Sequence, residues 1–136
     1  MNTAHDIVDG DPSGQPPSIL VAEDDALVRR VVVDYLRDCG FPVIEAGTAD
    51  EAIGLLETSE RVDIVFSDVQ MPGSLDGFAL AQWVRREQPH MRVILTSGAP
   101  RTVGVAGAVC DAGPLMRKPY ELGELARRIR ELVAAP

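Results

Sequence analysis

The stretch Val62-Asp-Ile-Val-Phe-Ser-Asp-Val-Gln-Met-Pro72 organises the predicted fold of this chain. Its apolar run, residues 64–66, is bounded by polar residues, which is typical of a strand buried on both faces of a parallel sheet. The run stops before Asp68, and Pro72 and Gly73 then favour a turn of the backbone. Asp68 is therefore expected at the carboxyl end of a buried strand, where open α/β sheets bind their ligands.

The length and composition are those of one ordinary globular domain. The chain has 136 residues, of which 46% are hydrophobic and 25% are charged, and this suffices for a single domain with its own core. The net charge of −8 argues against a nucleic-acid partner and against binding to anionic membranes, because both select basic surfaces. The sequence shows neither a secretory signal nor an apolar run of membrane-spanning length. We therefore expect a cytoplasmic protein.

Five apolar segments are interpreted as strands that alternate with helical segments along the chain. The predicted strands are residues 19–22, 42–45, 64–66, 92–96 and 115–116. Strands and helices that alternate with short connections predict a doubly wound parallel sheet with helices on both faces. Residues 18–134 form this domain, and residues 1–17, rich in Asp, Gly, Pro and Ser, are interpreted as a disordered leader.

The helices are predicted from apolar residues spaced three and four apart. In the first helix the expected buried stripe, which ends before Gly40, is Val28, Val31, Val32, Tyr35, Leu36 and Cys39. Cys39 is thereby interpreted as a buried thiol, and it lacks metal-ligand spacing to Cys110. Thr48 and Glu51 form a capping box that opens the second helix. Residues 98–113 are rich in glycine and are expected to form at most one or two helical turns.

Polar side chains follow four of the predicted strands, at the same edge of the sheet. Glu23 and Asp24 follow the first strand, Asp68 the third, Thr96 closes the fourth and Lys118 the fifth. Because three carboxylates at one edge repel one another, a bound cation is expected there. Oxygen donors without Cys or His favour Mg²⁺. A carboxylate can itself be the nucleophile that forms an aspartyl phosphate, with a lysine and a hydroxyl beside the phosphoryl oxygens.

Each of these residues also has an ordinary structural interpretation when taken alone. Asp24 or Asp25 could be a helix N-cap, and Asp68 could cap a turn. Thr96 could be an ordinary strand end and Lys118 a solvated charge. The hypothesis of a reactive site depends on all of these residues meeting at one edge of the sheet.

Together the motifs make the chain resemble the receiver domain of two-component response regulators, over about residues 18–134. The matching motifs, in the family's order, are Glu23-Asp24-Asp25, Asp68 with Met71-Pro72, Thr96-Ser97-Gly98, and Lys118-Pro119. The resemblance implies a five-stranded, flavodoxin-like sheet with the strand order 2-1-3-4-5. No single motif would be specific, but the set is.

The resemblance also implies a chemistry for the acidic edge. Asp68 is implied to accept a phosphoryl group from a histidine kinase or a phosphotransfer protein. Glu23, Asp24, Asp68 and the backbone carbonyl of Gln70 are implied to hold Mg²⁺. The catalysis implied is limited to the Mg²⁺-dependent phosphorylation and dephosphorylation of the domain itself. The output is a surface that binds an unknown downstream protein.

Thr96 and Lys118 are implied to contact the phosphoryl group, and Lys118-Pro119 to be a cis peptide. The sequence departs from the family's pattern where the output switch is expected. Leu115 stands where an aromatic residue is usual, and the loop 73–77 is one residue longer than its commonest form. The switch segment thus includes Thr96 and Leu115, but the main conformational change on phosphorylation is expected in residues 98–113.

Three interpretations of the function remain. The first is a stand-alone receiver that switches a protein-binding surface when it is phosphorylated. The second is a receiver-like scaffold that binds a partner without phosphorylation. The third is an aspartyl phosphohydrolase of the haloacid dehalogenase type, which is disfavoured because those enzymes have Asp where this chain has Gln70. The chain could also be a piece of a larger signalling protein.

Overall fold

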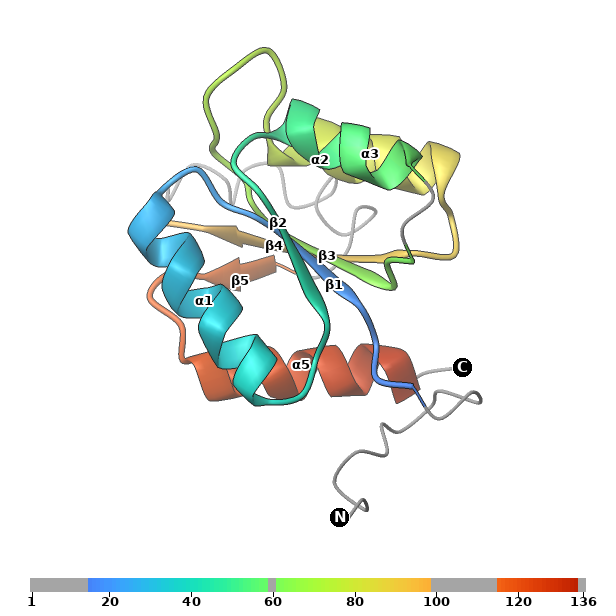
Figure 1. Ribbon diagram of the computed structural model, residues 1–136. Coiled ribbons are helices and arrows are strands. Elements are labelled where there is room, and N and C mark those ends of the chain that lie inside the picture. The colour runs from blue at the N-terminus through green and yellow to red at the C-terminus, as the bar shows by residue number, and fades with distance from the viewer. Residues whose placement is uncertain (1–14, 59–60, 99–114, 135–136) are drawn as a thin grey trace.

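The computed structural model describes residues 15–58, 61–98 and 115–134, which form a parallel sheet covered by helices (Figure 1). The sheet has five strands in the order β2-β1-β3-β4-β5. The elements are β1 (Ile19–Ala22), α1 (Ala26–Asp38), β2 (Val43–Ala46), α2 (Ala49–Glu57), β3 (Ile64–Asp68), α3 (Gly77–Glu87), β4 (Arg92–Ser97), β5 (Leu115–Arg117) and α5 (Leu122–Ala134). This arrangement confirms the predicted doubly wound, flavodoxin-like fold, and every strand begins within one residue of its predicted position.

The two faces of the sheet carry separate apolar cores, as the alternation of side chains along a strand requires. Leu20 and Val65 pack on one face in the cluster that α2 and α3 cover. Ile19, Ile64 and Phe66 pack on the opposite face, in the cluster that α1 and α5 cover (Figure 1). The central strand β3 is buried along its whole length. The sheet is therefore buried on both faces, and its carboxyl edge holds the acidic residues.

Local signals set the ends of the first helix. The side chain of Asp25 is the N-cap of α1 and accepts hydrogen bonds from the backbone N–H groups of Leu27 and Val28. Of the two aspartates considered for this role, Asp25 therefore takes it, and Asp24 is not used as the cap. The helix ends before Gly40, whose φ of 99° lies in the left-handed region that glycine adopts without strain.

The predicted buried stripe of α1 is wrong in its first half. Val28 and Val31 are 37% and 56% exposed, beside Leu27 at 80%, whereas the helix buries Val32, Val33 and Leu36. The reason is that the side chains of Val28 and Val31 line an apolar groove. The buried-thiol interpretation is wrong too, because Cys39 is only half-buried, at the carboxyl end of the helix.

The predicted capping box at the start of α2 is confirmed, with one change in its second hydrogen bond. The Thr48 hydroxyl accepts the backbone N–H of Glu51 at 3.0 Å, as the capping box predicts. The Glu51 carboxylate returns to the backbone N–H of Gly47, one residue before the cap itself. The helix α3 begins with Asp76 as its N-cap.

Some sequence-based expectations concern residues outside the described ranges. The expected leader lies mostly before residue 15, and the expected switch segment, residues 98–113, is described only at Gly98. Cys110 is outside the described ranges as well. These expectations remain predictions. Within the described ranges, no helix combines the length and the apolar character that crossing a membrane requires.

Candidate functional site

Parallel pairing brings the carboxylates of two strands together at one edge of the sheet. Ala22, the last residue of β1, is in register with Ser67, the residue before Asp68 in β3. Glu23 and Asp24 follow Ala22 directly, and their carboxylate oxygens and those of Asp68 lie within 4.8 Å of one another. Glu23 and Asp68 are buried, whereas Asp24 is exposed to solvent. The predicted acidic cluster is therefore present and opens outward through Asp24.

The electrostatics of the cluster favour a bound cation. Burial raises the pKa of Glu23 above its usual value, and the charges of Asp68 and Asp24 raise it further. The Asp25 N–H, which donates to Glu23 Oε2 at 3.1 Å, and the charge of Lys118 oppose this rise. A set of oxygen donors that are partly desolvated and mutually repelling fits a hard divalent ion such as Mg²⁺.

Lys118 reaches into the same cluster from the end of β5. Its Nζ lies 2.8 Å from Asp68 Oδ2 and 4.0 Å from Glu23 Oε1. Although burial lowers the pKa of Lys118, its hydrogen bond to Asp68 and the acidic charges raise the pKa above its usual value overall. The Lys118–Pro119 peptide is cis, as the resemblance implied. The lysine is therefore a fixed positive charge beside the Asp68 carboxylate.

Thr96 lies directly beside Asp68 in the neighbouring strand. The two residues are register partners in β3 and β4, and the Val69 N–H donates to the Thr96 carbonyl at 2.9 Å. The Thr96 hydroxyl is buried and has no hydrogen-bond partner among the residues described. A buried hydroxyl without a partner is costly, so this group is suited to bind an incoming oxyanion at Asp68.

The structure places Gln70 and Leu115 near the site but does not test their predicted roles. The backbone N–H of Gln70 donates to Asp68 Oδ1 at 3.2 Å, so Gln70 lies next to the cluster, but the metal-binding role of its carbonyl remains a prediction. Leu115 begins β5 and pairs with Leu95. Its role in a switch also remains a prediction.

Sequence reasoning missed Gly77, whose backbone packs against the backbone of Asp68 and Val69. The Gly77 N–H donates to the carbonyl of Val69 at 2.7 Å. A Cβ on this residue would lie 2.2 Å from the Asp68 carbonyl oxygen and 2.7 Å from the Cα of Val69. The first turn of α3 therefore packs directly on the backbone of Asp68. Only the tertiary contact reveals this, because a glycine after an N-cap carries no such signal in the sequence.

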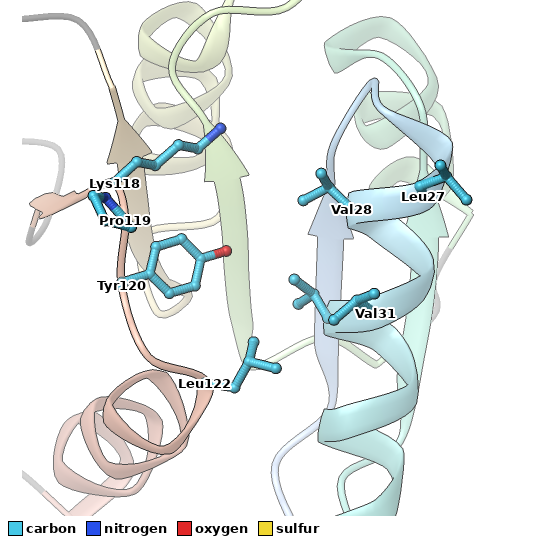
Figure 2. A pocket seen from close by; sticks show the side chains of 8 residues that line it. Leu27, Val28, Val31, Lys118, Pro119, Tyr120 and Leu122 are labelled. Carbon is cyan, nitrogen blue, oxygen red and sulfur yellow. The ribbon is translucent and has the colours of Figure 1, made fainter.

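Sequence reasoning also missed an apolar groove beside the site (Figure 2). The groove, of about 670 Å³, is lined by Leu27, Val28, Val31, Val32, Lys118, Pro119, Tyr120 and Leu122. Figure 2 shows the side chains of α1 on one side of the groove, and on the other those of the segment between β5 and α5 together with Leu122, the first residue of α5. Lys118 belongs both to the groove and to the acidic site.

Tyr120 connects the groove to the site electrostatically. Its ring packs edge-on against Phe66 of β3, with the ring centroids 5.8 Å apart. Burial and the charges of Glu23 and Asp68 raise the pKa of Tyr120 to about 12. The phenol therefore stays protonated at neutral pH and is available as a hydrogen-bond donor close to the acids.

An α/β sheet with three carboxylates, a lysine and an unpartnered hydroxyl at its carboxyl edge defines a class of domain that can hold a divalent cation and a phosphoryl group there. The family model described as the response regulator receiver domain matches residues 19–130. The chain therefore belongs to the receiver domains of two-component response regulators, as the resemblance indicated.

Individual relatives agree with the family. The chain is 31% identical over 127 residues to the transcriptional regulatory protein PdtaR of Mycobacterium tuberculosis, covering 88% of this chain and 61% of that protein. It is 34% identical over 125 residues to the sensor kinase CckA of Brucella abortus, covering 90% of this chain and 13% of that protein. The chain spans about half the length of the probable transcriptional regulators ycf27 of Porphyridium aerugineum, Pyropia yezoensis and Porphyra purpurea, which it also matches.

The fold is shared with solved receivers. A response regulator receiver protein from Sinorhizobium medicae superposes with a TM-score of 0.80 at 26% identity, covering 88% of this chain and 96% of that chain. A CheY-like receiver from Methanospirillum hungatei superposes equally well, at 0.80, with 23% identity and coverage of 88% and 94%. Two structures so similar in fold at low identity support the strand order described above.

Proposed function

We propose that this domain accepts a phosphoryl group on Asp68 from a histidine kinase or a phosphotransfer protein, and that the aspartyl phosphate switches a protein-binding surface. The observation that carries the proposal is the position of Lys118 Nζ, 2.8 Å from Asp68 Oδ2 and inside a cluster of three carboxylates. A lysine so placed neutralises charge on a phosphoryl group at Asp68. Membership of the receiver family removes the haloacid dehalogenase interpretation.

The proposed reaction moves the phosphoryl group from an imidazole nitrogen of the donor to a carboxylate oxygen of Asp68. A carboxylate oxygen of Asp68 attacks phosphorus, the bond from phosphorus to the donor's imidazole nitrogen breaks, and its electron pair stays on that nitrogen. Lys118 and the Thr96 hydroxyl receive the phosphoryl oxygens. Glu23, Asp24, Asp68 and the Gln70 carbonyl are the residues that would hold Mg²⁺. The chemistry that bound Mg²⁺ supplies is charge neutralisation between the carboxylates and the phosphoryl oxygens.

The partners follow from the surroundings of Asp68. A donor protein that places a phosphohistidine at Asp68 approaches next to the groove, because Lys118 lines both. The exposed apolar residues Leu27, Val28 and Val31 therefore fit a protein donor. The net charge of −8 supports protein partners for this domain in place of nucleic acid or membrane, and a cytoplasmic location fits such partners.

The test is phosphorylation by a small donor. With acetyl phosphate and Mg²⁺, the wild type should gain the mass of one phosphoryl group in intact-mass spectrometry, and Asp68→Asn should gain none. The substitution is nearly isosteric, so circular dichroism should show an unchanged fold. A wild type that stays unlabelled would favour the scaffold that binds without phosphorylation. Continued labelling of Asp68→Asn would place the acceptor elsewhere.

A further inference from the structure

We infer that Arg29 is a positioning residue for the acidic site, because it holds the peptide that joins Glu23 to Asp24. The inference rests on the proposed Mg²⁺ site and concerns how the chain keeps that site in shape. Arg29 contributes no oxygen ligand, so its effect must pass through the backbone of the two acids. No sequence pattern pointed to this residue.

Arg29 makes two directed contacts from the second turn of α1. Its Nη1 donates to the carbonyl oxygen of Glu23 at 2.7 Å, and its Nε donates to Glu45 Oε1 at 3.2 Å. The side chain is only 23% exposed. The planar guanidinium can satisfy both partners at once with a fixed angle between them, which a lysine cannot do. Arg29 therefore links α1, the acidic loop and β2.

The contact to Glu23 controls the orientation of two carboxylates. The carbonyl that Arg29 binds belongs to the peptide between Glu23 and Asp24, so its direction sets ψ of the first residue and φ of the second. The N–H of Glu23 is held separately by the carbonyl of Ala46 at 3.0 Å. With both sides of Glu23 tied to fixed partners, its side chain and that of Asp24 leave the backbone in defined directions. Mg²⁺ requires near-ideal geometry, so this restraint should matter for affinity.

The chain provides a matched control in Arg37. This residue lies on the same helix, its Nη2 donates to the carbonyl of Val43 at 3.0 Å, and the same nitrogen lies 3.8 Å from Glu45 Oε2. Arg37 thus has the same kinds of partner as Arg29, including the same carboxylate. The difference is that Val43 begins β2, away from the acids, whereas Glu23 is itself an acid of the site.

An electrostatic effect of Arg29 and a positioning effect would change the affinity for Mg²⁺ in opposite directions. Removing a positive charge close to the acids should strengthen the binding of a cation. Removing a positioning contact should weaken it. The direction of the change in Arg29→Gln therefore separates the two effects. Arg37→Gln is the control for losing a positive charge, a hydrogen bond to a backbone carbonyl and a contact with Glu45 on the same helix without touching the acidic loop, although its contact with Glu45 is an ion pair at 3.8 Å and that of Arg29 is a hydrogen bond at 3.2 Å.

The experiment is isothermal titration of the full chain with Mg²⁺. Arg29→Gln should weaken Mg²⁺ binding roughly tenfold, the size expected for one hydrogen bond to a charged group, while Arg37→Gln stays within about twofold of wild type. Arg29→Lys should lie between, because an ammonium can still donate but lacks the rigid fork that directs two N–H groups at once. Urea unfolding should give similar stabilities for the two Gln variants, so a difference in affinity would not reflect a difference in folding.

Two other outcomes are informative. Unchanged or tighter binding by Arg29→Gln, beside a wild type that binds Mg²⁺, would overturn the positioning role and leave the proposed function intact. A wild type that binds no Mg²⁺ would overturn the metal site of the proposed function and this inference with it. If Arg29→Gln failed to fold, Arg29→Lys against Arg37→Lys would decide the same question, with weaker binding expected only for the former.

Discussion

Gly77 ties the backbone of Asp68 to the helix that follows it. A Cβ at this position would meet backbone atoms of Asp68 and Val69, which cannot move aside as the end of a side chain can. Whether position 77 can accept a side chain is therefore decided by the backbone of Asp68 and Val69, which also orients the Asp68 carboxylate. A substitution here should disturb both stability and reactivity, although residue 77 contributes no group to the chemistry.

We predict that Gly77→Ala lowers the free energy of unfolding by about 1–3 kcal/mol, because the added methyl overpacks a rigid contact. Urea denaturation monitored by circular dichroism measures this, and labelling by acetyl phosphate should be slower as well. Gly54 is the control, because it is an exposed glycine of α2 with no atom within 4 Å of an added Cβ. Gly54→Ala should raise stability by about 1 kcal/mol through helix propensity. Equal effects of the two substitutions would contradict the close-packing account.

The opening turns of α1 are apolar without being part of the core. Leu27, Val28 and Val31 stay exposed along one side of the groove, and Tyr120 and Leu122 line the other side (Figure 2). An exposed apolar stripe next to a reactive site is typical of a protein-binding surface. It lies on the same helix as Arg29, so α1 carries both the residue proposed to position the acidic loop and the apolar surface proposed to meet a donor protein.

We predict that Val31→Asp separates the protein donor from the small donor. The position is 56% exposed, so the fold should be retained and labelling by acetyl phosphate should not change. Transfer from a phosphorylated histidine kinase that labels the wild type should fall roughly tenfold or more, as expected when a charge enters an apolar contact. Asp34→Ala, an exposed change on the same helix outside the groove lining, should transfer normally. Equal kinase transfer to Val31→Asp and wild type would exclude this face from donor binding.

Charge repulsion at the carboxyl edge links metal binding to the stability of the whole domain. Three carboxylates lie within 4.8 Å, and only part of their mutual repulsion is offset by Lys118. A ligand that binds the folded chain alone stabilises it by mass action. Because the cluster is assembled by strands far apart in the sequence, the unfolded chain lacks this site.

We predict that Mg²⁺ at ten times its dissociation constant adds about 1.4 kcal/mol to the free energy of unfolding. Thermal denaturation with increasing Mg²⁺ measures the effect as a rising Tm. Asp24→Asn should remove the dependence on Mg²⁺, and it should also raise the Tm of the metal-free domain because one repelling charge is lost. A Tm of the wild type that ignores Mg²⁺, or an equal rise in Asp24→Asn, would place the metal elsewhere.

The order of strands and helices, and the edge at which the reactive groups meet, could be predicted from the sequence. The apolar run before Asp68 needs burial on both faces, and short connections between alternating elements predict a doubly wound parallel sheet. The strand order 2-1-3-4-5 was implied by the resemblance to receiver domains. In any parallel sheet the strand ends meet at one edge, so Glu23, Asp24, Asp68 and Lys118 could be placed together from their positions in the chain alone. Local hydrogen bonding likewise made Thr48 and Gly40 recognisable as the start and the end of helices.

Contacts between distant segments decided the rest. Helical periodicity shows which residues share a face but not what covers that face, so Val28 and Val31 were predicted to be buried and instead line an open groove. The roles of Gly77 and Arg29 depend on backbone atoms that approach from other elements, and a backbone atom is the same in every residue. The types of the residues therefore do not reveal such contacts, which arise only once the sheet and its helices have packed.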